Sequence, residues 1–523
     1  MTLSSVFVQQ TVLVGVLMMM AVQTPCGIRA ANILAVETVP GRSHWNFMSA
    51  VLRALAERGH KVVAFTSYPS TAGVQDADSN YTEVDTSAVL RRHAGEQASH
   101  VLGDYSRLSY IVPSVVRWSR DFCDAVYGMK EIRALMANRT EAAAEFDLLV
   151  IEPLGSECVS YLAATVGLPM VYVMPTPMIS YIQPSVVGHS ANPAYVPHLL
   201  YGSSVRAFWQ RMANTAVYSY GRLARWYAER TATRRPYDVG EPAKPSIVFV
   251  NSHQVTEPAM LLPSNVIHVG GIHLEKPRIL PPKIQEFIDN SPHGVIYFTF
   301  GSVIAMSTLP EHIQNTFKNV FRQIPQRVLW KYEGEMEDKP NNVMTGNWFP
   351  QRDVLSHPNV KLFISHGGIS GVYETVDAGV PVLGFPLYYD QPRNLQNLVD
   401  AGMAITMELM SVTKQQFLYN IKELLSNTNY TKNAKITANR FKDRPMTPQE
   451  SVVYWTEYVI RHNGAHHLKS EALNLTWYQY LLLDVISVVA VLFVVLIYLM
   501  YKMSTFFYLS TINYLSGLKR KQE

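Results

Sequence analysis

Cysteine and unbalanced charge are both scarce in this sequence. Its 523 residues contain three cysteines, and Cys26 lies beside an apolar N-terminal run, so that only Cys123 and Cys158 remain in the rest of the chain. The sequence therefore excludes a disulfide framework and allows at most one bridge. The formal net charge is +4, too small for the strongly basic face of a nucleic-acid-binding protein. We expect no nucleic-acid partner.

Long apolar runs occur only at the two ends of the chain. Residues 12–22 read "VLVGVLMMMAV" and are followed by small and polar residues. This pattern predicts a signal peptide over residues 1–30 and a mature chain that begins near Ala31. No Lys or Arg precedes the run, which leaves an uncleaved anchor as the alternative.

At the other end, residues 485–501 carry no charge and can be extended backward to a predicted transmembrane helix over 478–501. Basic residues follow, so residues 502–523 are expected as a short cytosolic tail and the body as lumenal, in a single-pass type I arrangement. Lys519 and Lys521 have the spacing of a dilysine retrieval signal, which predicts the endoplasmic reticulum membrane. The alternative is an ordinary stop-transfer cluster. Four N-x-S/T sequons are compatible with a lumenal surface: Asn80, Asn138, Asn429 and Asn474.

Between these ends, short apolar runs alternate with helical patterns. Residues 32–38 and 61–67 read as strands on either side of a helix that includes 47–59, which is a βαβ unit. The alternation continues in both halves of the chain, and the proline-rich stretch 269–283 interrupts it. We therefore predict an α/β fold with two Rossmann-like, doubly wound domains that face a cleft, where ligands would bind. The expected domains are 31–268 and 284–470, with 269–283 as the linker.

Residues 205–235 depart from this alternation. They carry seven arginines and one glutamate, interleaved with Trp209, Trp226 and several tyrosines. This composition suits contact with anionic lipid. A solvated helix pair on the surface of the first domain is the preferred interpretation.

The chemistry-bearing residues of the second domain follow its predicted strands. Gly367 and Gly368 come directly after an apolar run and His366, where a helix begins. Because glycine has no Cβ, backbone N–H groups there can approach a ligand closely, and the positive end of the helix dipole favours a phosphate. Three further loops, "TFGSV", "GNWFPQRDVLSHP" and "PLYYDQPRN", also follow or precede strands. We expect all four to converge at one edge of the sheet.

The stretch from Asn347 to Asn394, "NWFPQRDVLSHPNVKLFISHGGISGVYETVDAGVPVLGFPLYYDQPRN", resembles the donor-binding signature of the membrane-bound UDP-glycosyltransferases, the family that includes the glucuronosyltransferases. The resemblance is greatest to invertebrate members and extends over essentially the whole chain. It implies GT-B architecture and inverting transfer of a hexose from a UDP-sugar to a hydroxyl of a small lipophilic acceptor, for detoxification or endogenous conjugation. The UDP-sugar would be a co-substrate, and neither a cofactor nor a metal is expected.

Carried over position by position, the resemblance implies roles in donor binding. Trp348 would stack on the uracil, with Gln351 beside the nucleoside. Glu374 would accept hydrogen bonds from the two ribose hydroxyls. Asp390 and Gln391 would bind hydroxyls of the sugar. The residues expected around the diphosphate are Ser302, His366, Gly367, Gly368 and Ser370.

The family's catalytic histidine follows the first strand, where this chain reads "GRSHW" and supplies His44. As a general base, its imidazole would remove the proton of the acceptor hydroxyl. The family's partner to this histidine is an aspartate after the strand "FDLLVIE", and here the position holds Glu152. A carboxylate would orient the ring and stabilise the imidazolium, although the extra methylene leaves a salt bridge or a helix cap as alternatives. His60, in a turn, is expected to be inert.

Two other groups have residue types that bind metals. Asp76 and Asp78 form a D-x-D, but they lie in a polar loop beside a sequon. His462, His466 and His467 lie close to the C-terminal span without an accompanying cysteine or carboxylate set. Neither group predicts a metal site.

Glucose is the expected sugar. A glucuronosyl carboxylate would need a cation near the sugar, and Arg393, two places after Gln391, is expected to start a helix that points away from the cleft. Two other functions remain as alternatives: a lipid-specific UDP-sugar transferase, and a catalytically silent family member that acts as a binding or regulatory subunit. The sequence leaves homo-oligomerisation and the identity of the acceptor open.

Overall fold

The protein was analysed as a computed structural model. It describes residues 30–519 apart from 71–79, 91–100, 106, 203, 233–239 and 303. The predicted signal peptide up to residue 29, the D-x-D of Asp76 and Asp78, and Lys521 therefore lie outside the described residues. The chain divides into two compact units, of which the first ends at Lys469 and the second begins at Ser470.

Seven parallel strands form one sheet of the first unit, in the order β3-β2-β1-β4-β5-β6-β7. The order reverses between β1 and β4, the point where doubly wound folds bind ligands. The central strands are apolar along their whole length because helices cover both faces of the sheet. The strands are β1 (Asn32–Val36), β2 (Lys61–Thr66), β3 (Tyr81–Asp85), β4 (Leu148–Ile151), β5 (Met170–Met174), β6 (Ile247–Val250) and β7 (Val266–His268).

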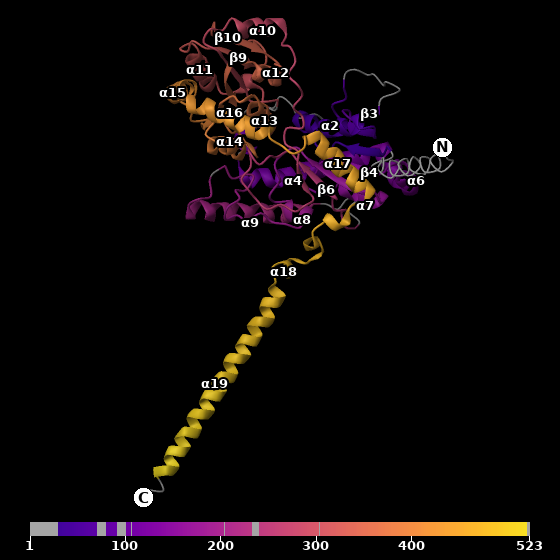
Figure 1. Ribbon diagram of the computed structural model, residues 1–523, viewed down its shortest axis with the longest axis vertical. Coiled ribbons are helices and arrows are strands. Elements are labelled where there is room, and N and C mark those ends of the chain that lie inside the picture. Colours follow the sequence, from indigo (N-terminus) through magenta and orange to yellow (C-terminus); the bar gives the residue numbers. More distant parts are fainter. Residues whose placement is uncertain are drawn as a thin grey trace, which may run out of the picture. The chain divides into compact units, whose positions relative to one another are not determined.

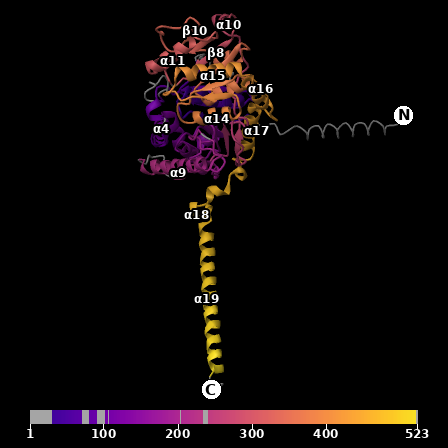
Figure 2. The same ribbon diagram turned by 90° about the vertical axis from the view of Figure 1, so that its left-hand side faces the viewer.

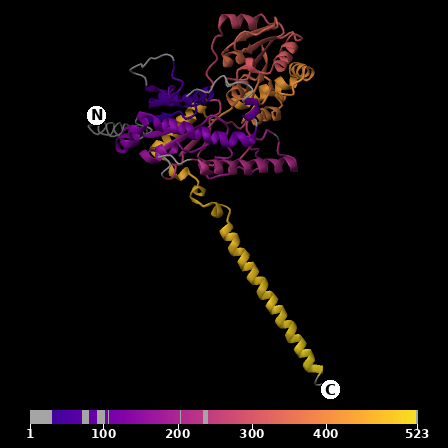
Figure 3. The same ribbon diagram turned by 180° about the vertical axis from the view of Figure 1, so that it is seen from behind.

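The helices that accompany this sheet include two long ones, α4 and α9, which pack side by side (Figure 3). The helices are α2 (Arg42–Glu57), the π-helix η1 (Val101–Tyr105), α4 (Leu108–Gly128), α5 (Lys130–Ala137), α6 (Arg139–Glu145), α7 (Ser160–Val166), α8 (Gln183–Val187) and α9 (Phe208–Thr231). The stretch 205–235 thus contains the single helix α9 within its described part, and the expected helix pair is wrong.

Six parallel strands form the second sheet, in the order β10-β9-β8-β11-β12-β13, with the reversal between β8 and β11. Two of its strands, β8 and β10, are labelled in Figure 2. The strands are β8 (Val295–Thr299), β9 (Arg327–Lys331), β10 (Val343–Gly346), β11 (Val360–Ser365), β12 (Val382–Gly384) and β13 (Ala404–Thr406). The helices are α10 (Pro282–Asp289), the 3₁₀ helix η2 (Met306–Thr308), α11 (Glu311–Phe321), α12 (Gln351–Ser356), α13 (Ile369–Ala378), α14 (Gln391–Asp400), α15 (Lys414–Ser426), α16 (Thr428–Lys442) and α17 (Pro448–Arg461).

The helix α17 lies within the range expected for the second domain, yet it packs against α2 and β6 of the first sheet (Figure 1). Glu457 of α17 accepts a hydrogen bond from Arg58 Nε at 3.0 Å and lies 3.5 Å from His60 Nε2. His60 Nδ1 in turn accepts a hydrogen bond from the backbone of Ala31. His60 therefore joins the first residues of the first domain to α17, and it does not line the cavity described below.

The second unit contains one short 3₁₀ segment, one short α segment and one long apolar helix, α19 (Leu483–Lys519). Residues Leu483–Leu518 have a mean hydropathy of 2.8 in their most apolar window, and none of that window is buried in protein. The helix is long and apolar enough to cross a membrane. The helix begins at Leu483, five residues after residue 478, where the expected span starts. It continues to Lys519, through residues that were expected to form the cytosolic tail.

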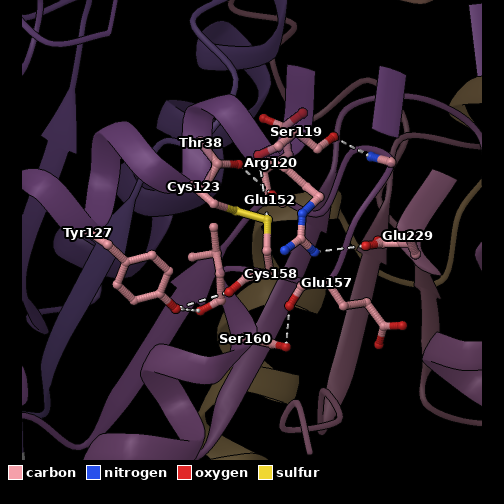
Figure 4. The surroundings of a disulfide bond; sticks show 12 residues. Thr38, Ser119, Arg120, Cys123, Tyr127, Glu152, Glu157, Cys158, Ser160 and Glu229 are labelled. Carbon is pink, nitrogen blue, oxygen red and sulfur yellow. Dashed lines mark hydrogen bonds and ion pairs between the residues drawn. A yellow bond between two sulfur atoms is a disulfide. The ribbon is translucent and has the colours of Figure 1, made fainter. Parts of the chain in front are cut away.

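Cys123 of α4 and Cys158, in the loop after β4, form a disulfide (Figure 4). The bridge is buried, and Tyr127 Oη donates to the carbonyl of Cys158 beside it at 3.0 Å. The single bridge that the sequence allows is therefore present, and it ties α4 to the segment that carries Glu152.

Candidate active site

A cavity of about 330 Å³ lies between the two sheets and takes its lining from loops at the carboxyl ends of their strands. Its wall includes ten of the predicted site residues: His44, Ser302, Trp348, Gln351, His366, Gly368, Ser370, Glu374, Asp390 and Gln391. The two that it leaves out are Glu152 and Gly367. Residues more than 300 positions apart thus meet in one site, as the predicted cleft requires.

His44 lies in the first turn of α2, because this helix begins at Arg42, earlier than the sequence pattern indicated. Its Nδ1 is 2.5 Å from Oε1 of Glu152, which follows β4. The Glu152 side chain is 1% exposed, and the His44 side chain is 22% exposed with its free edge in the cavity. Glutamate at this position therefore reaches the ring, which leaves Nε2 of His44 available to a ligand.

Burial by itself would lower the pKa of His44, but the charge and hydrogen bond of Glu152 raise it, with smaller contributions from Asp390 and Glu37, and the net pKa is raised. Burial raises the pKa of Glu152, and His44 opposes that shift. An ion pair of His44 and Glu152 is the physical basis of both effects. The carboxylate makes the imidazole a stronger base than it would be alone.

The helix α13 points its N-terminus at the cavity. Among the described hydrogen bonds, the backbone N–H groups of Ile369, Ser370 and Gly371 have no acceptor, and all three residues line the cavity. Such free N–H groups, with the positive end of the helix dipole, form an anion site. The arrangement suits the diphosphate expected there.

His366 requires the two glycines that face it. A Cβ on Gly368 would lie 2.6 Å from His366 Nε2, and a Cβ on Gly301 would lie 2.8 Å from its Cε1. Burial and the positive Lys331 lower the pKa of His366 to about 4, so the ring is neutral at pH 7. A neutral imidazole beside an anion would act as a hydrogen-bond donor.

Gly367 has a different position from the one expected. Its φ is +85°, and a Cβ there would lie 2.4 Å from Leu395 Cγ of α14. Its N–H donates to Ser365 Oγ and its carbonyl accepts from Asn394 Nδ2. Gly367 therefore packs against α14 on the side of the turn away from the cavity, and its backbone N–H and carbonyl groups are already hydrogen-bonded.

The part of the cavity expected to bind the nucleoside contains Trp348, Gln351 and Glu374. The indole of Trp348 is 62% exposed, so one face is available for stacking. Gln351 Nε2 donates to Glu374 Oε2. Burial raises the pKa of Glu374 to about 7, and the hydrogen bond from Gln351 opposes this shift.

The part of the cavity expected to bind the sugar contains Asp390 and Gln391, directly before and at the start of α14. Asp390 Oδ2 accepts a hydrogen bond from Asn394 Nδ2 at 2.7 Å, and burial raises its pKa to about 6. Gln391 Oε1 accepts from the backbone of Leu387 and Tyr388, which holds the preceding loop. In this loop Tyr389 adopts φ +56°, a strained conformation for a non-glycine residue.

The remaining wall of the cavity is apolar and was not found from the sequence. Ile111, Val115, Trp118 and Phe122 of α4 line it, together with Tyr105. The spacing of 4, 3 and 4 along α4 puts these side chains on one face of the helix, a signal that the sequence did contain.

Arg393 does not line the cavity. Its guanidinium is buried, donates to Glu257 Oε2 at 2.6 Å and also bonds the carbonyl of Pro197 in the first domain. The Arg and Lys side chains of the described lining are Arg42 and Lys331, and Lys331 Nζ is 2.5 Å from Glu333 Oε1. The guanidinium of Arg393 is therefore already paired in a contact between the two domains.

Within the described residues, no group of three or more His, Cys, Asp or Glu side chains has the geometry of a metal site. His467 Nε2 instead lies 2.7 Å from Tyr458 Oη, and the rings of His462 and His467 pack on Tyr458.

Comparisons with known proteins show the family of the chain. A family profile described as "UDP-glucoronosyl and UDP-glucosyl transferase" matches residues 33–516. The chain is 38% identical over 484 residues to "UDP-glucosyltransferase 2" of Dactylopius coccus, covering 88% of this chain and 90% of the relative. It is 31% identical to "UDP-glucuronosyltransferase 2C1" of Oryctolagus cuniculus, with coverages of 92% and 99%.

Solved structures show the same fold at low identity. The glycosyltransferase of kitacinnamycin superposes with a TM-score of 0.56 and 19% identity, covering 83% of this chain and 99% of its own. Spinosyn forosaminyltransferase SpnP superposes with a TM-score of 0.53 and 16% identity, with coverages of 83% and 100%. The two Rossmann-type sheets are those of the GT-B fold.

Proposed function

The chain belongs to the family of UDP-glucuronosyl and UDP-glucosyl transferases, and we propose that it transfers glucose from UDP-glucose to a hydroxyl of small lipophilic acceptors. The observation that carries the proposal is the position of His44. Its Nδ1 is 2.5 Å from Oε1 of Glu152, and the ring lines a cavity that has an apolar wall on α4 and the N-terminus of α13 as an anion site. A base between an apolar acceptor and a nucleotide-sugar is what this reaction needs.

In the proposed mechanism, α13, His366 and Lys331 hold the diphosphate, while Trp348 and Glu374 hold the nucleoside. An acceptor hydroxyl on the α4 side donates to His44 Nε2. As its oxygen attacks C1 of the sugar from the face opposite UDP, the proton passes to Nε2 and UDP departs with the bonding electrons. The configuration at C1 is thereby inverted, and the Glu152 carboxylate stabilises the imidazolium. The proposed reaction uses neither a metal nor a cofactor.

The central test is transfer of labelled glucose to a phenol and to an aliphatic alcohol by the full chain. His44→Ala should abolish transfer to the alcohol while UDP binding survives, because His44 and the donor half belong to different domains. An alcohol is the stricter acceptor since its hydroxyl does not ionise unaided. A His44→Ala variant that retains more than about a tenth of the alcohol activity contradicts a general-base role. Transfer that is unaffected by EDTA is expected, and loss of activity restored by a divalent ion contradicts the metal-free reaction.

The donor is tested by competition between equal concentrations of UDP-glucose and UDP-glucuronate. Glucose is favoured because Arg393 is paired with Glu257, outside the cavity. A predominance of glucuronide contradicts this choice of donor. Arg42→Ala would then show whether Arg42, the lining cation that the proposed mechanism does not use, binds the carboxylate.

We further propose that α19 anchors the protein in the endoplasmic reticulum membrane with its body in the lumen. The basic C-terminal end and the four exposed sequons support this orientation. In sealed microsomes, added protease should remove a C-terminal tag while the body stays protected and carries N-linked glycans. A protected tag would reverse the orientation.

Two other family functions make different predictions. A lipid-specific transferase would label an extracted lipid fraction and ignore soluble phenols. A catalytically silent member would bind UDP-glucose without turnover of any acceptor. The pairing of His44 with Glu152 supports an active enzyme over a silent one.

A further inference from the structure

A second buried carboxyl group lies beside Glu152. Glu37 directly follows β1 and is 1% exposed. In the sheet, Val36 is the register partner of Phe65 on β2 and of Ile151 on β4. Continuing this register by one residue puts Glu37 between Thr66 and Glu152, with the three side chains on one face of the sheet.

The hydrogen bonds of the two carboxyl groups are complementary. Glu37 Oε2 accepts from Thr66 Oγ1 at 2.9 Å, from the Ser67 backbone at 2.6 Å and from Ser67 Oγ at 3.0 Å. Glu152 Oε1 bonds to His44. The other oxygen of each, Oε1 of Glu37 and Oε2 of Glu152, is buried and has no hydrogen-bond partner.

Two unpaired carboxylate oxygens on neighbouring strands would be costly, because each loses its water and like charges repel. A single proton removes both costs. We propose that Glu37 is a positioning residue for the transfer reaction: it keeps a proton on Oε1 and donates it in a hydrogen bond to Oε2 of Glu152, which fixes the carboxylate under His44. This inference rests on the proposed function of His44 as the base.

The charges around the pair are consistent with this assignment. Burial raises the pKa of Glu37 to about 7, the hydrogen bonds from Ser67 and Thr66 lower it, and Glu152 raises it. His44 of α2 faces the two carboxyl groups. Asp390, in the loop before α14, raises the pKa of His44. The end of β2 contributes hydroxyls, and Tyr68 Oη donates to the carbonyl of Pro40.

The proton on Glu37 has a consequence for the reaction. While Glu37 is neutral, its charge does not add to those of Glu152 and Asp390 near His44, and His44 can release its proton before the acceptor binds. When Glu37 ionises, its charge raises the pKa of His44 and repels Glu152. The proposal therefore predicts an alkaline limb in the pH profile of kcat that belongs to Glu37.

The activity test compares Glu37→Gln with Glu37→Ala in the full chain. Glutamine keeps an acceptor for Ser67 and a permanent donor for Glu152, so it should lower kcat less than threefold at pH 7 and remove the alkaline limb. Alanine should lower kcat roughly tenfold or more and leave KM for UDP-glucose within about twofold. Glu83→Ala is the matched control, because Glu83 holds the same β2–β3 connection through Ser70 and does not touch Glu152.

A second measurement does not depend on turnover. The ring of His44 is partly exposed in the cavity, so diethyl pyrocarbonate should modify it at a rate proportional to its neutral fraction, read by mass spectrometry of the peptide. In Glu37→Gln the rate should reach its plateau at a lower pH than in the wild type, because an ionisable neighbour that raises the pKa of His44 is gone.

The outcomes separate this inference from the proposed function. A wild type without transferase activity but with the expected modification shift refutes the function and supports the carboxyl pair. An alkaline limb that persists in Glu37→Gln refutes the role of Glu37, and so does a glutamine variant as slow as the alanine variant. Equal losses in Glu37→Ala and Glu83→Ala would show that Glu37 only holds the loop.

Discussion

At the scale of single residues, the environment of each carboxyl group decides its chemistry. Glu374 and Asp390 line the same cavity and Glu152 lies behind His44 in its wall, yet their partners are an amide, an asparagine and a histidine. Burial raises the pKa of each, because the charged form loses its water. The ionisation of Glu374 and Asp390 at neutral pH therefore depends on what a ligand donates to them, whereas Glu152 is paired with His44.

Binding of UDP should depend on pH through Glu374. The free carboxyl has a pKa raised to about 7, and hydrogen bonds from the ribose hydroxyls favour the ionised form. Affinity should be constant above pH 7 and fall up to about tenfold per pH unit below it, because binding must displace a proton. Calorimetric titration between pH 5.5 and 8 measures this dependence.

Glu374→Gln should bind UDP more weakly and without that pH dependence. Glu311→Gln, at the start of α11 and away from the cavity, is the control for loss of one acidic group. A pH dependence that survives in Glu374→Gln would assign the titration to another group.

At the scale of elements, α4 links the disulfide to the apolar wall of the cavity. Phe122, which lines the cavity, is the neighbour of Cys123, and Cys158 lies six residues after Glu152. The bridge therefore restrains both the apolar wall and the partner of the proposed base (Figure 4).

Removal of this bridge should lower stability and loosen acceptor binding. Cys123→Ala with Cys158→Ala frees a segment with a sequence separation of 35 residues, for which a loss of roughly 3 to 4 kcal/mol in unfolding free energy is expected. KM for the acceptor should rise while the affinity for UDP, bound by the second sheet, stays the same. Thermal unfolding and steady-state kinetics measure the two effects, and a rise in the Kd of UDP instead would contradict the division of the site.

The helix α9 has a buried face and an exposed face that is rich in large apolar side chains. Asn214, Tyr218 and Gly221 are buried against the body, and the opposite face exposes six large side chains. These are Phe208, Trp209, Met212, Leu223, Trp226 and Tyr227, each more than half exposed. With the arginines of this helix, the exposed face favours the lipid alternative over a fully solvated surface.

A chain that ends at Lys469 should therefore still bind vesicles that contain anionic lipid. Trp209→Ser with Trp226→Ser should reduce co-sedimentation several-fold, because it removes the aromatic part of the exposed face. The matched control is Met410→Ser with Tyr419→Ser, two exposed side chains of the second domain. Equal binding by neutral and anionic vesicles would show that the arginines contribute nothing.

At the scale of the whole molecule, buried polar contacts join the two Rossmann-type domains. Arg393 of α14 pairs with Glu257 of the first domain, and both side chains are about 5% exposed. Tyr373 of α13 shares a 3.0 Å hydrogen bond with Thr256. The helices that carry the proposed donor site are thus held directly by the segment after β6.

Breaking the Arg393–Glu257 pair should destabilise the protein by about 3 kcal/mol or more, because the remaining partner would be a buried, unpaired charge. Arg393→Met should lower the unfolding temperature, and the double variant Arg393→Met with Glu257→Leu should recover much of the loss. Thermal unfolding in detergent measures this cycle. If the double variant is no more stable than the single one, the charges are not coupled in the way proposed.

The sequence by itself determined the alternation of strands and helices, the two-domain fold and the long apolar helix near the C-terminus, and its resemblance to a known family supplied the candidate site residues. These features depend on local periodicity and on short segments, such as "SHGGISGVYE", whose chemistry is complete within about ten residues. Tertiary structure alone decided that Gly367 faces Leu395, that Arg393 joins the domains, that α17 returns to the first sheet and that α4 lines the cavity. Each of these depends on contacts between residues far apart in the chain. Burial, charge and packing at such contacts are set by spatial neighbours that a local sequence pattern does not predict.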